Sequence, residues 1–99
     1  MRMLLHASIP TKKGNEALDS GDLQQAMQRV TESLKPEAAY FFADRNGNRS
    51  SFFVFDMEGS WQLPPILEPL FHTFEATVHV TPVMNADDIQ RGMQELSNT

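Results

Sequence analysis

The chain contains no cysteine, and this absence removes several classes of chemistry. Without thiols there can be no disulfide framework, no thiolate metal site and no cysteine nucleophile. The apolar segment near the N-terminus, Met3 to Ile9, is interrupted by His6 and Ser8 and is too short for a membrane span or a signal-peptide core. We therefore expect a cytoplasmic protein that does not act in a membrane.

Positive charge is also scarce. Eight Lys and Arg residues stand against thirteen Asp and Glu, which gives a formal net charge of −5 at pH 7. The basic residues are scattered, so they form no stripe that could follow a phosphate backbone. Composition thus argues against nucleic acid and anionic membranes as partners. The remaining composition, 40% hydrophobic and 21% charged over 99 residues, predicts one folded domain spanning residues 1–99.

Known catalytic and cofactor motifs are missing as well. The sequence has no nucleophile elbow, phosphate-binding loop, dinucleotide fingerprint, zinc-protease motif or calcium-binding loop. The five glycines are isolated, and the six methionines are typical of gap-filling core residues. We expect no cofactor and no metal site.

Apolar spacing predicts the first half of the fold. Arg2–Ile9 alternates weakly and ends at a proline, as a buried strand does. Thr11–Gly21 is polar and holds two glycines, which predicts a loop. Asp22, three residues before Gln25, resembles a capping box. A helix then follows, with an apolar stripe at Leu23, Ala26, Met27, Val30 and Leu34, and Pro36 ends it.

The second half repeats the pattern. Two aromatic-rich runs, Ala38–Asp44 and Arg49–Glu58, flank an Asn-Gly turn, which predicts a β-hairpin. Apolar residues between Leu63 and Phe74 have helical spacing, but Pro69 in the interior predicts a short or kinked helix. Glu75–Met84 alternates as a strand. Its Pro82 favours a sheet edge, and Asn85 with Asp88 begins a last short helix.

This order of elements predicts a ferredoxin-like βαββαβ sandwich of the α+β class with a C-terminal helix. Its antiparallel sheet has the strand order 4-1-3-2. The hairpin supplies apolar side chains to both faces of the sheet, whereas the helices can cover only one. The other face, which we call the open face, needs a partner, most simply a second copy of the chain.

Strand parity places the candidate site residues on the open face. His6 on the first strand, His79 on the last and Asp56 on the third are candidates for general acid–base catalysis, because histidine titrates near neutral pH and a carboxylate can orient it. The interpretation that the sequence favours over catalysis is that these are polar residues at strand ends or at a dimer interface, bonded to backbone or water. Two imidazoles and a carboxylate are also groups that ligate divalent metals, which is the least favoured of the three interpretations. Phe52 and Val54 are candidate ligand-binding residues on the same face.

Trp61, in the loop after the third strand, is a further candidate ligand-binding residue. Its indole can act as a lid over the cavity mouth, because loops carry function. It can equally pack as a staple on the following helix. The sequence leaves both interpretations open.

The whole chain resembles the dimeric α/β-barrel superfamily. The sequence-level similarity lies in the segment 74–84, FEATVHVTPVM, which resembles the closing strand of small uncharacterised bacterial proteins of that superfamily. The resemblance implies a homodimer in which two sheets pack face to face and the C-terminal segment reaches across the partner. Enzymes of the superfamily include muconolactone isomerase-like proteins, cofactor-free monooxygenases of aromatic substrates and haem-degrading enzymes.

Two functions therefore stay open at the level of sequence. The first is a homodimer that binds or transforms a small hydrophobic or aromatic molecule in a cavity on the open sheet face. The alternative is a structural or sensing dimer with no enzymatic activity. One fold hosts many chemistries, so the resemblance does not decide between them.

Overall fold

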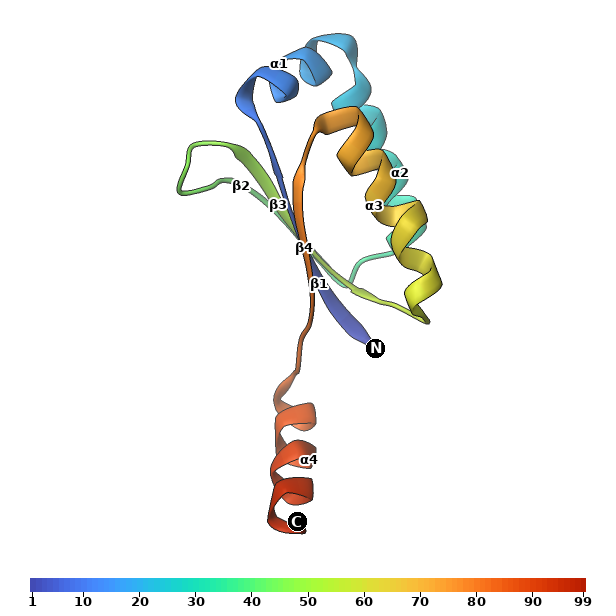
Figure 1. Cartoon of the computed structure of the whole chain (residues 1–99), viewed down its shortest axis with the longest axis vertical. Helices are drawn as coiled ribbons and strands as arrows, with labels where there is room; N and C mark the ends of the chain where they lie inside the picture. Colours follow the sequence, from blue (N-terminus) through green and yellow to red (C-terminus); the bar gives the residue numbers. More distant parts are fainter.

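A four-stranded antiparallel sheet forms the body of the structure, a computed structural model that describes residues 1–99 (Figure 1). The strands β1 (Arg2–Ile9), β2 (Ala38–Ala43), β3 (Arg49–Asp56) and β4 (Thr77–Pro82) pair in the order β2-β3-β1-β4. This is the predicted order 4-1-3-2 read from the opposite edge, so the α+β prediction and the strand order are confirmed. The helices are α1 (Thr11–Ser20), α2 (Asp22–Leu34), α3 (Leu63–Phe74) and α4 (Ala86–Ser97), with a 3-10 turn η1 (Ser60–Gln62) before α3.

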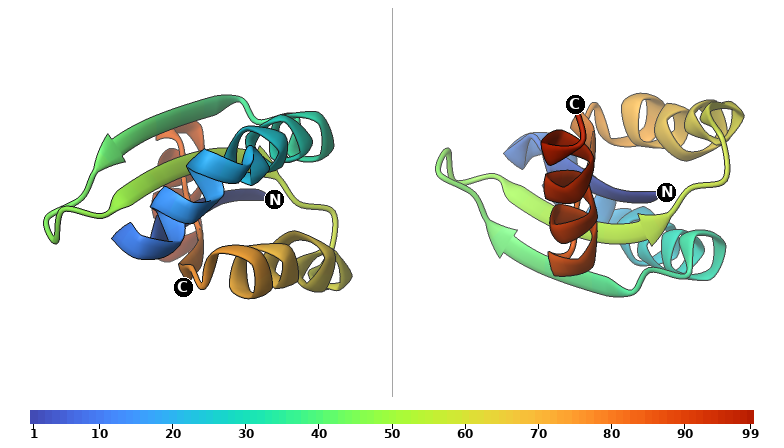
Figure 2. Two further views of the ribbon diagram at one scale, coloured as in Figure 1. Left: turned by 90° about the horizontal axis from the view of Figure 1, so that it is seen from above. Right: turned by 90° about the horizontal axis from the view of Figure 1, so that it is seen from below.

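Helices α1, α2 and α3 cover one face of this sheet and leave the other free (Figures 1 and 2). On the covered face, Leu5 of β1 lies opposite Phe53 of β3, and Met3 lies opposite Phe55. All four side chains are buried in one hydrophobic cluster. Because strand residues alternate between faces, their neighbours Leu4, His6, Phe52 and Val54 point to the open face, as the sequence predicted.

The hairpin between β2 and β3 forms where the Asn-Gly pair predicted it. Asp44 donates its backbone N–H to the carbonyl of Asn48 at 2.9 Å, and Gly47 donates to the carbonyl of Asp44 at 2.9 Å. Gly47 has a φ of +77°, a conformation that glycine adopts without steric cost. The turn fixes the register of the hairpin, in which Phe42 lies opposite Ser50.

The loop predicted for Thr11–Gly21 is wrong, because the segment from Thr11 to Ser20 is helix α1. Its local helix propensity is poor, but Ala17 is buried against Phe74 and Ala76, and this packing outweighs propensity. Gly14 does not break the helix. Gly21, with a φ of +86°, ends α1 and joins it to α2.

Three further local predictions concern a helix cap and two prolines. The capping box at Asp22 is wrong: Gly21, which has no side chain, occupies the N-cap position of α2, and the Asp22 N–H donates to Ser20 Oγ at 3.3 Å. Helix α3 runs without interruption through Pro69, with Pro64 and Pro65 in its first turn. On β4, Pro82 lies on an edge strand as expected.

None of the helices is long and apolar enough to cross a membrane.

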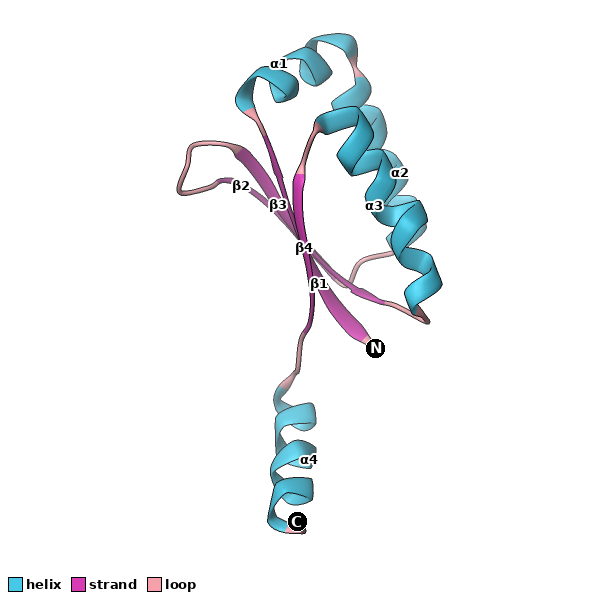
Figure 3. Cartoon of the chain, viewed as in Figure 1, coloured by secondary structure: helices cyan, strands magenta, loops and turns pink.

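Helix α4 projects away from the sheet along the long axis of the molecule (Figures 1 and 3). Its predicted capping box forms: the Asp88 N–H donates to Asn85 Oδ1 at 2.9 Å, and the Asn85 N–H donates to Asp88 Oδ2 at 3.1 Å. Every residue of α4 is exposed. The radius of gyration is therefore 15.7 Å, against about 13 Å for a compact chain of this length.

Candidate functional site

A cavity of about 660 Å³ lies between the covered face of the sheet and helices α2 and α3. Fourteen of its 24 lining residues are hydrophobic. The sheet contributes Leu5 and Phe53, α2 contributes Ala26 and Val30, and α3 contributes Leu70. Helix α2 has no buried residue, so its apolar stripe faces this space without filling it.

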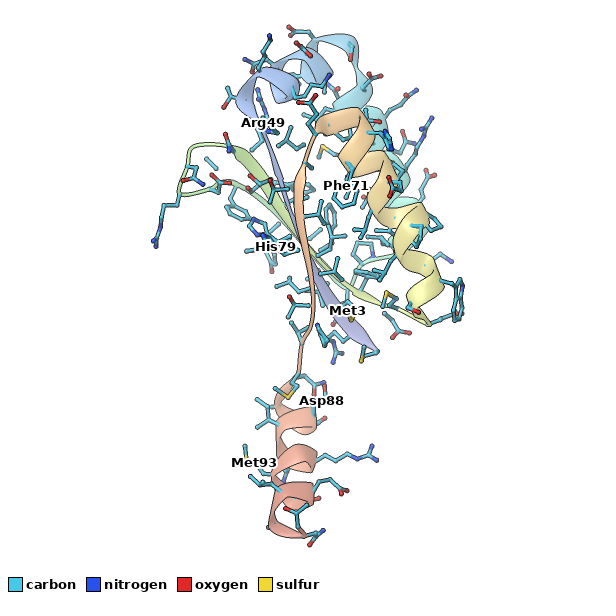
Figure 4. The ribbon with its side chains drawn as sticks, viewed as in Figure 1. Met3, Arg49, Phe71, His79, Asp88 and Met93 are labelled. Carbon is cyan, nitrogen blue, oxygen red and sulfur yellow. The ribbon has the colours of Figure 1, made fainter.

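Three charged residues line the same cavity: Arg29 and Asp22 on α2, and Arg49 at the start of β3. The lining thus carries two guanidinium groups and one carboxylate, in a chain whose formal net charge is −5. Arg49 lies at the end of the sheet next to α1 (Figure 4). It donates from Nη2 to Asn15 Oδ1 of that helix at 3.0 Å. Neither arginine has a carboxylate oxygen within 4.0 Å.

On the open face, His6 is the centre of an aromatic cluster. Register places His6 opposite Phe52 of β3 on one side and His79 of β4 on the other. Ring centroids lie 4.8 Å apart for His6 and Phe52, 5.9 Å for His6 and Phe42, and 6.2 Å for His6 and His79. The structure therefore brings together His6, His79 and Phe52 of the predicted site. Phe42, which was not predicted, completes the cluster.

The imidazole of His6 is left with an unsatisfied polar atom. Its Nε2 is buried and has no hydrogen-bond partner. A buried polar atom without a partner costs free energy, on the order of 1–3 kcal/mol. The unpaired Nε2 therefore destabilises the chain rather than helping to hold the cluster together. His79, in contrast, is exposed.

Asp56 does not join the histidines. It lies opposite Arg2, four residues along β1 from His6, which is about 13 Å at the rise of a strand. Its Oδ1 accepts a hydrogen bond from the N-terminal ammonium of Met1 at 2.7 Å. The sequence left open whether Asp56 converges with His6, because it does not give the strand register; the register of the structure keeps the two apart. Without Asp56, the two imidazoles have no carboxylate to orient them.

The carboxylate that the sequence analysis missed is Asp44, at the end of β2. Its Oδ2 accepts hydrogen bonds from Ser8 Oγ at 2.7 Å and Ser50 Oγ at 2.8 Å, and its Oδ1 accepts from the backbone N–H groups of Asn46 and Asn48. These bonds, that from Ser8 first, lower the pKa of Asp44 to about 2. The turn sequence could have indicated the backbone bonds, since Asp often accepts them at turns. The bond from Ser8 has no local signature.

The remaining candidates lie apart from the histidine pair. Val54 is half-buried on the open face, opposite Leu4 and Ala38. Trp61 lies in η1, is 68% exposed and does not line the cavity. A Cβ atom at Gly59 would lie 1.7 Å from its ring, so the indole rests on the backbone of that glycine.

An ion pair connects the N-terminal turn of α4 to the sheet. The Arg2 guanidinium donates to Glu37 and lies 3.6 Å from Asp88 of α4. The hydrogen bond with Glu37, and after it the Glu37 charge, raises the pKa of Arg2 above its ordinary value. This contact joins the start of α4 to the open face of β1, while the rest of the helix stays free.

No group of three or more His, Asp or Glu side chains is arranged to hold a metal ion. No protein-family model matches the chain, and no curated protein is significantly similar to it. The candidate functional surfaces are the cavity on the covered face and the aromatic cluster on the open face.

Proposed function

We propose that the chain is a homodimer that binds a small hydrophobic or aromatic molecule in the cavity between the sheet and helices α2 and α3. The observation that carries this proposal is the cavity itself. Its volume of about 660 Å³ falls within the usual range of ligand sites, roughly 300–1,000 Å³. Its lining is apolar with a few polar groups, as such sites usually are.

The proposed ligand site lies on the other face of the sheet from the one where the sequence analysis expected it. His6 and His79 point to the open face, whereas the cavity lies on the covered face, behind the sheet. A molecule in the cavity would not touch either imidazole. The proposal is therefore one of binding, and it favours a sensing or carrier dimer over an enzyme that uses this histidine pair.

Dimerisation is supported by the surface that one chain leaves exposed. Its accessible surface is 7008 Å², whereas a compact monomer of this mass exposes about 5,700 Å². The excess of about 1,300 Å² exceeds the roughly 800 Å² that each partner buries in a standard interface. The excess is consistent with apolar side chains that lie free on the open face, among them Tyr40 and Phe42, and on α4, among them Met93 and Leu96.

The arrangement we propose is a dimeric α/β barrel, with the two open faces packed together and each α4 lying across the partner. It covers the aromatic cluster around His6 and gives the apolar stripe of α4 a surface to contact.

Native mass spectrometry of freshly purified protein tests both parts. We expect a dimer carrying an additional small mass. Incubation followed by mass analysis of the released molecule then separates binding from conversion. A monomer would contradict the dimer, and a dimer that takes up no small aromatic molecule would contradict the ligand site.

A cavity-filling variant makes the second test specific. Ala26 lines the cavity, so Ala26→Phe should expel the bound mass while the dimer persists. Gln28→Phe adds the same side chain to the same helix at an exposed position outside the lining, and it should keep the ligand. Equal retention by both variants would place the ligand elsewhere.

A further inference from the structure

Arg49 is held in place at one end of the cavity without an acidic partner. One of its five N–H groups is used, in the bond to Asn15, and no carboxylate lies within ion-pair distance. The side chain is half-buried and lines the cavity. A guanidinium placed in this way can form two parallel hydrogen bonds with a carboxylate.

Gly14 of α1 provides the space for this side chain. A Cβ atom at position 14 would lie 2.6 Å from Nη1 of Arg49 and 3.3 Å from its Cδ. Gly14 lies inside a helix, where glycine is unfavourable relative to alanine. Two features of α1, the missing Cβ at Gly14 and the amide oxygen of Asn15, therefore fix the guanidinium at the cavity end.

We infer that the ligand of this cavity is an amphipathic carboxylate, with an apolar body between sheet and helices and its carboxylate paired with Arg49. The inference rests on the proposed function and adds the chemical class of the ligand. The other charged groups of the lining agree with it. Arg29 adds a second cation, and Asp22 is the single carboxylate, so the net charge of the lining is complementary to an anion.

The test compares two probes of nearly the same shape, naphthylacetate and the neutral naphthylacetamide. Isothermal titration calorimetry with the full-length protein, freed of bound molecules, measures both. We expect the acid to bind at least about tenfold more tightly than the amide, because the carboxylate gains charge-assisted hydrogen bonds. Arg49→Gln should remove that preference and leave the affinity for the amide unchanged.

Two variants control for net charge and for folding. Arg45 lies in the β2–β3 turn outside the cavity, so Arg45→Gln removes the same charge from the same hairpin and should keep the preference for the acid. Gly14→Ala keeps the charge of Arg49 but displaces its guanidinium, because of the contact at 2.6 Å. It should weaken binding of the acid and not of the amide. This variant carries the test if Arg49→Gln does not fold.

The outcomes separate this inference from the proposed function. If neither probe binds, the cavity is not a site for small aromatic molecules, and both proposals are overturned. If both probes bind equally, the cavity is a ligand site and the carboxylate inference alone is overturned. A preference for the acid that survives both Arg49→Gln and Gly14→Ala would show that Arg49 is not the anchor.

Discussion

Replacing Met93 of α4 by glutamate is predicted to dissociate the proposed dimer. Ile89, Met93 and Leu96 recur at a spacing that places them on one side of the helix, and they are 46%, 60% and 66% exposed. Figure 4 shows Met93 on the projecting helix, far from the sheet of its own chain. A stripe of this kind has a role only if another surface covers it.

The magnitude follows from the exposed fraction. Complete burial of a methionine contributes about 1.5–3 kcal/mol, so covering the exposed part of Met93 contributes about 1.5 kcal/mol. A twofold dimer contains the residue twice, which brings the loss in Met93→Glu to about 3 kcal/mol. That corresponds to a dissociation constant roughly a hundredfold weaker.

Sedimentation equilibrium over a series of protein concentrations measures this shift. Gln94→Glu is the matched control, because it adds the same charge one position along, on the other side of α4, and should leave the dimer intact. The reasoning is refuted if the wild-type chain is monomeric at every concentration. It is also refuted if Met93→Glu and Gln94→Glu dimerise equally well.

Three further predictions concern single side chains. Phe55 is 2% exposed in the main core cluster, so Phe55→Ala should lower the free energy of unfolding in urea by about 3–5 kcal/mol. The pKa of Asp44 is lowered in the folded chain, so its carboxylate stabilises the fold above its ordinary pKa of 3.8, and this contribution is lost as the pH falls toward about 2. Thermal unfolding of Asp44→Asn should therefore depend less on pH in this window than that of the wild type. His6→Leu removes the buried Nε2 that has no hydrogen-bond partner, so it should raise the free energy of unfolding of the isolated chain in urea by about 1 kcal/mol. His79→Leu, at an exposed position, should not raise it. A lower free energy of unfolding in His6→Leu would mean that Nε2 has a partner.

Strand parity and the hairpin could be predicted from sequence because both depend on short-range rules. The Asn-Gly pair sets the turn, and the alternation of Val78, His79 and Val80 indicates which side chains face the helices. Once the hairpin was placed, Pro82 identified the edge strand without any tertiary information. The face of the sheet on which His6 lies followed from the same rule.

The failed predictions depended on contacts between distant segments. Helix α1 forms because Ala17 packs on Phe74, and nothing in the local sequence around Gly14 reports this contact. Asp56 lies apart from His6 because the register between β1 and β3 pairs it with Arg2. A register shift of two or four residues moves a side chain along the strand and keeps its face, whereas a shift of one residue reverses the face. Parity therefore placed Asp56 on the same face as His6 but could not reveal how far apart the two residues lie.

The composition of β3 supports the proposed dimer. Phe52 and Phe53 are consecutive, so they point to opposite faces, and a single layer of helices can bury only Phe53. The chain's own α4 does not cover the other face, because the contact between Asp88 and Arg2 holds its start at the end of β1 and the helix runs outward from there. Neither the helices on the covered face nor α4 thus covers the open face of the same chain. Each copy of the chain has one open face and one exposed apolar helix. In a dimer, the two open faces can therefore cover each other, and each α4 can lie on the partner.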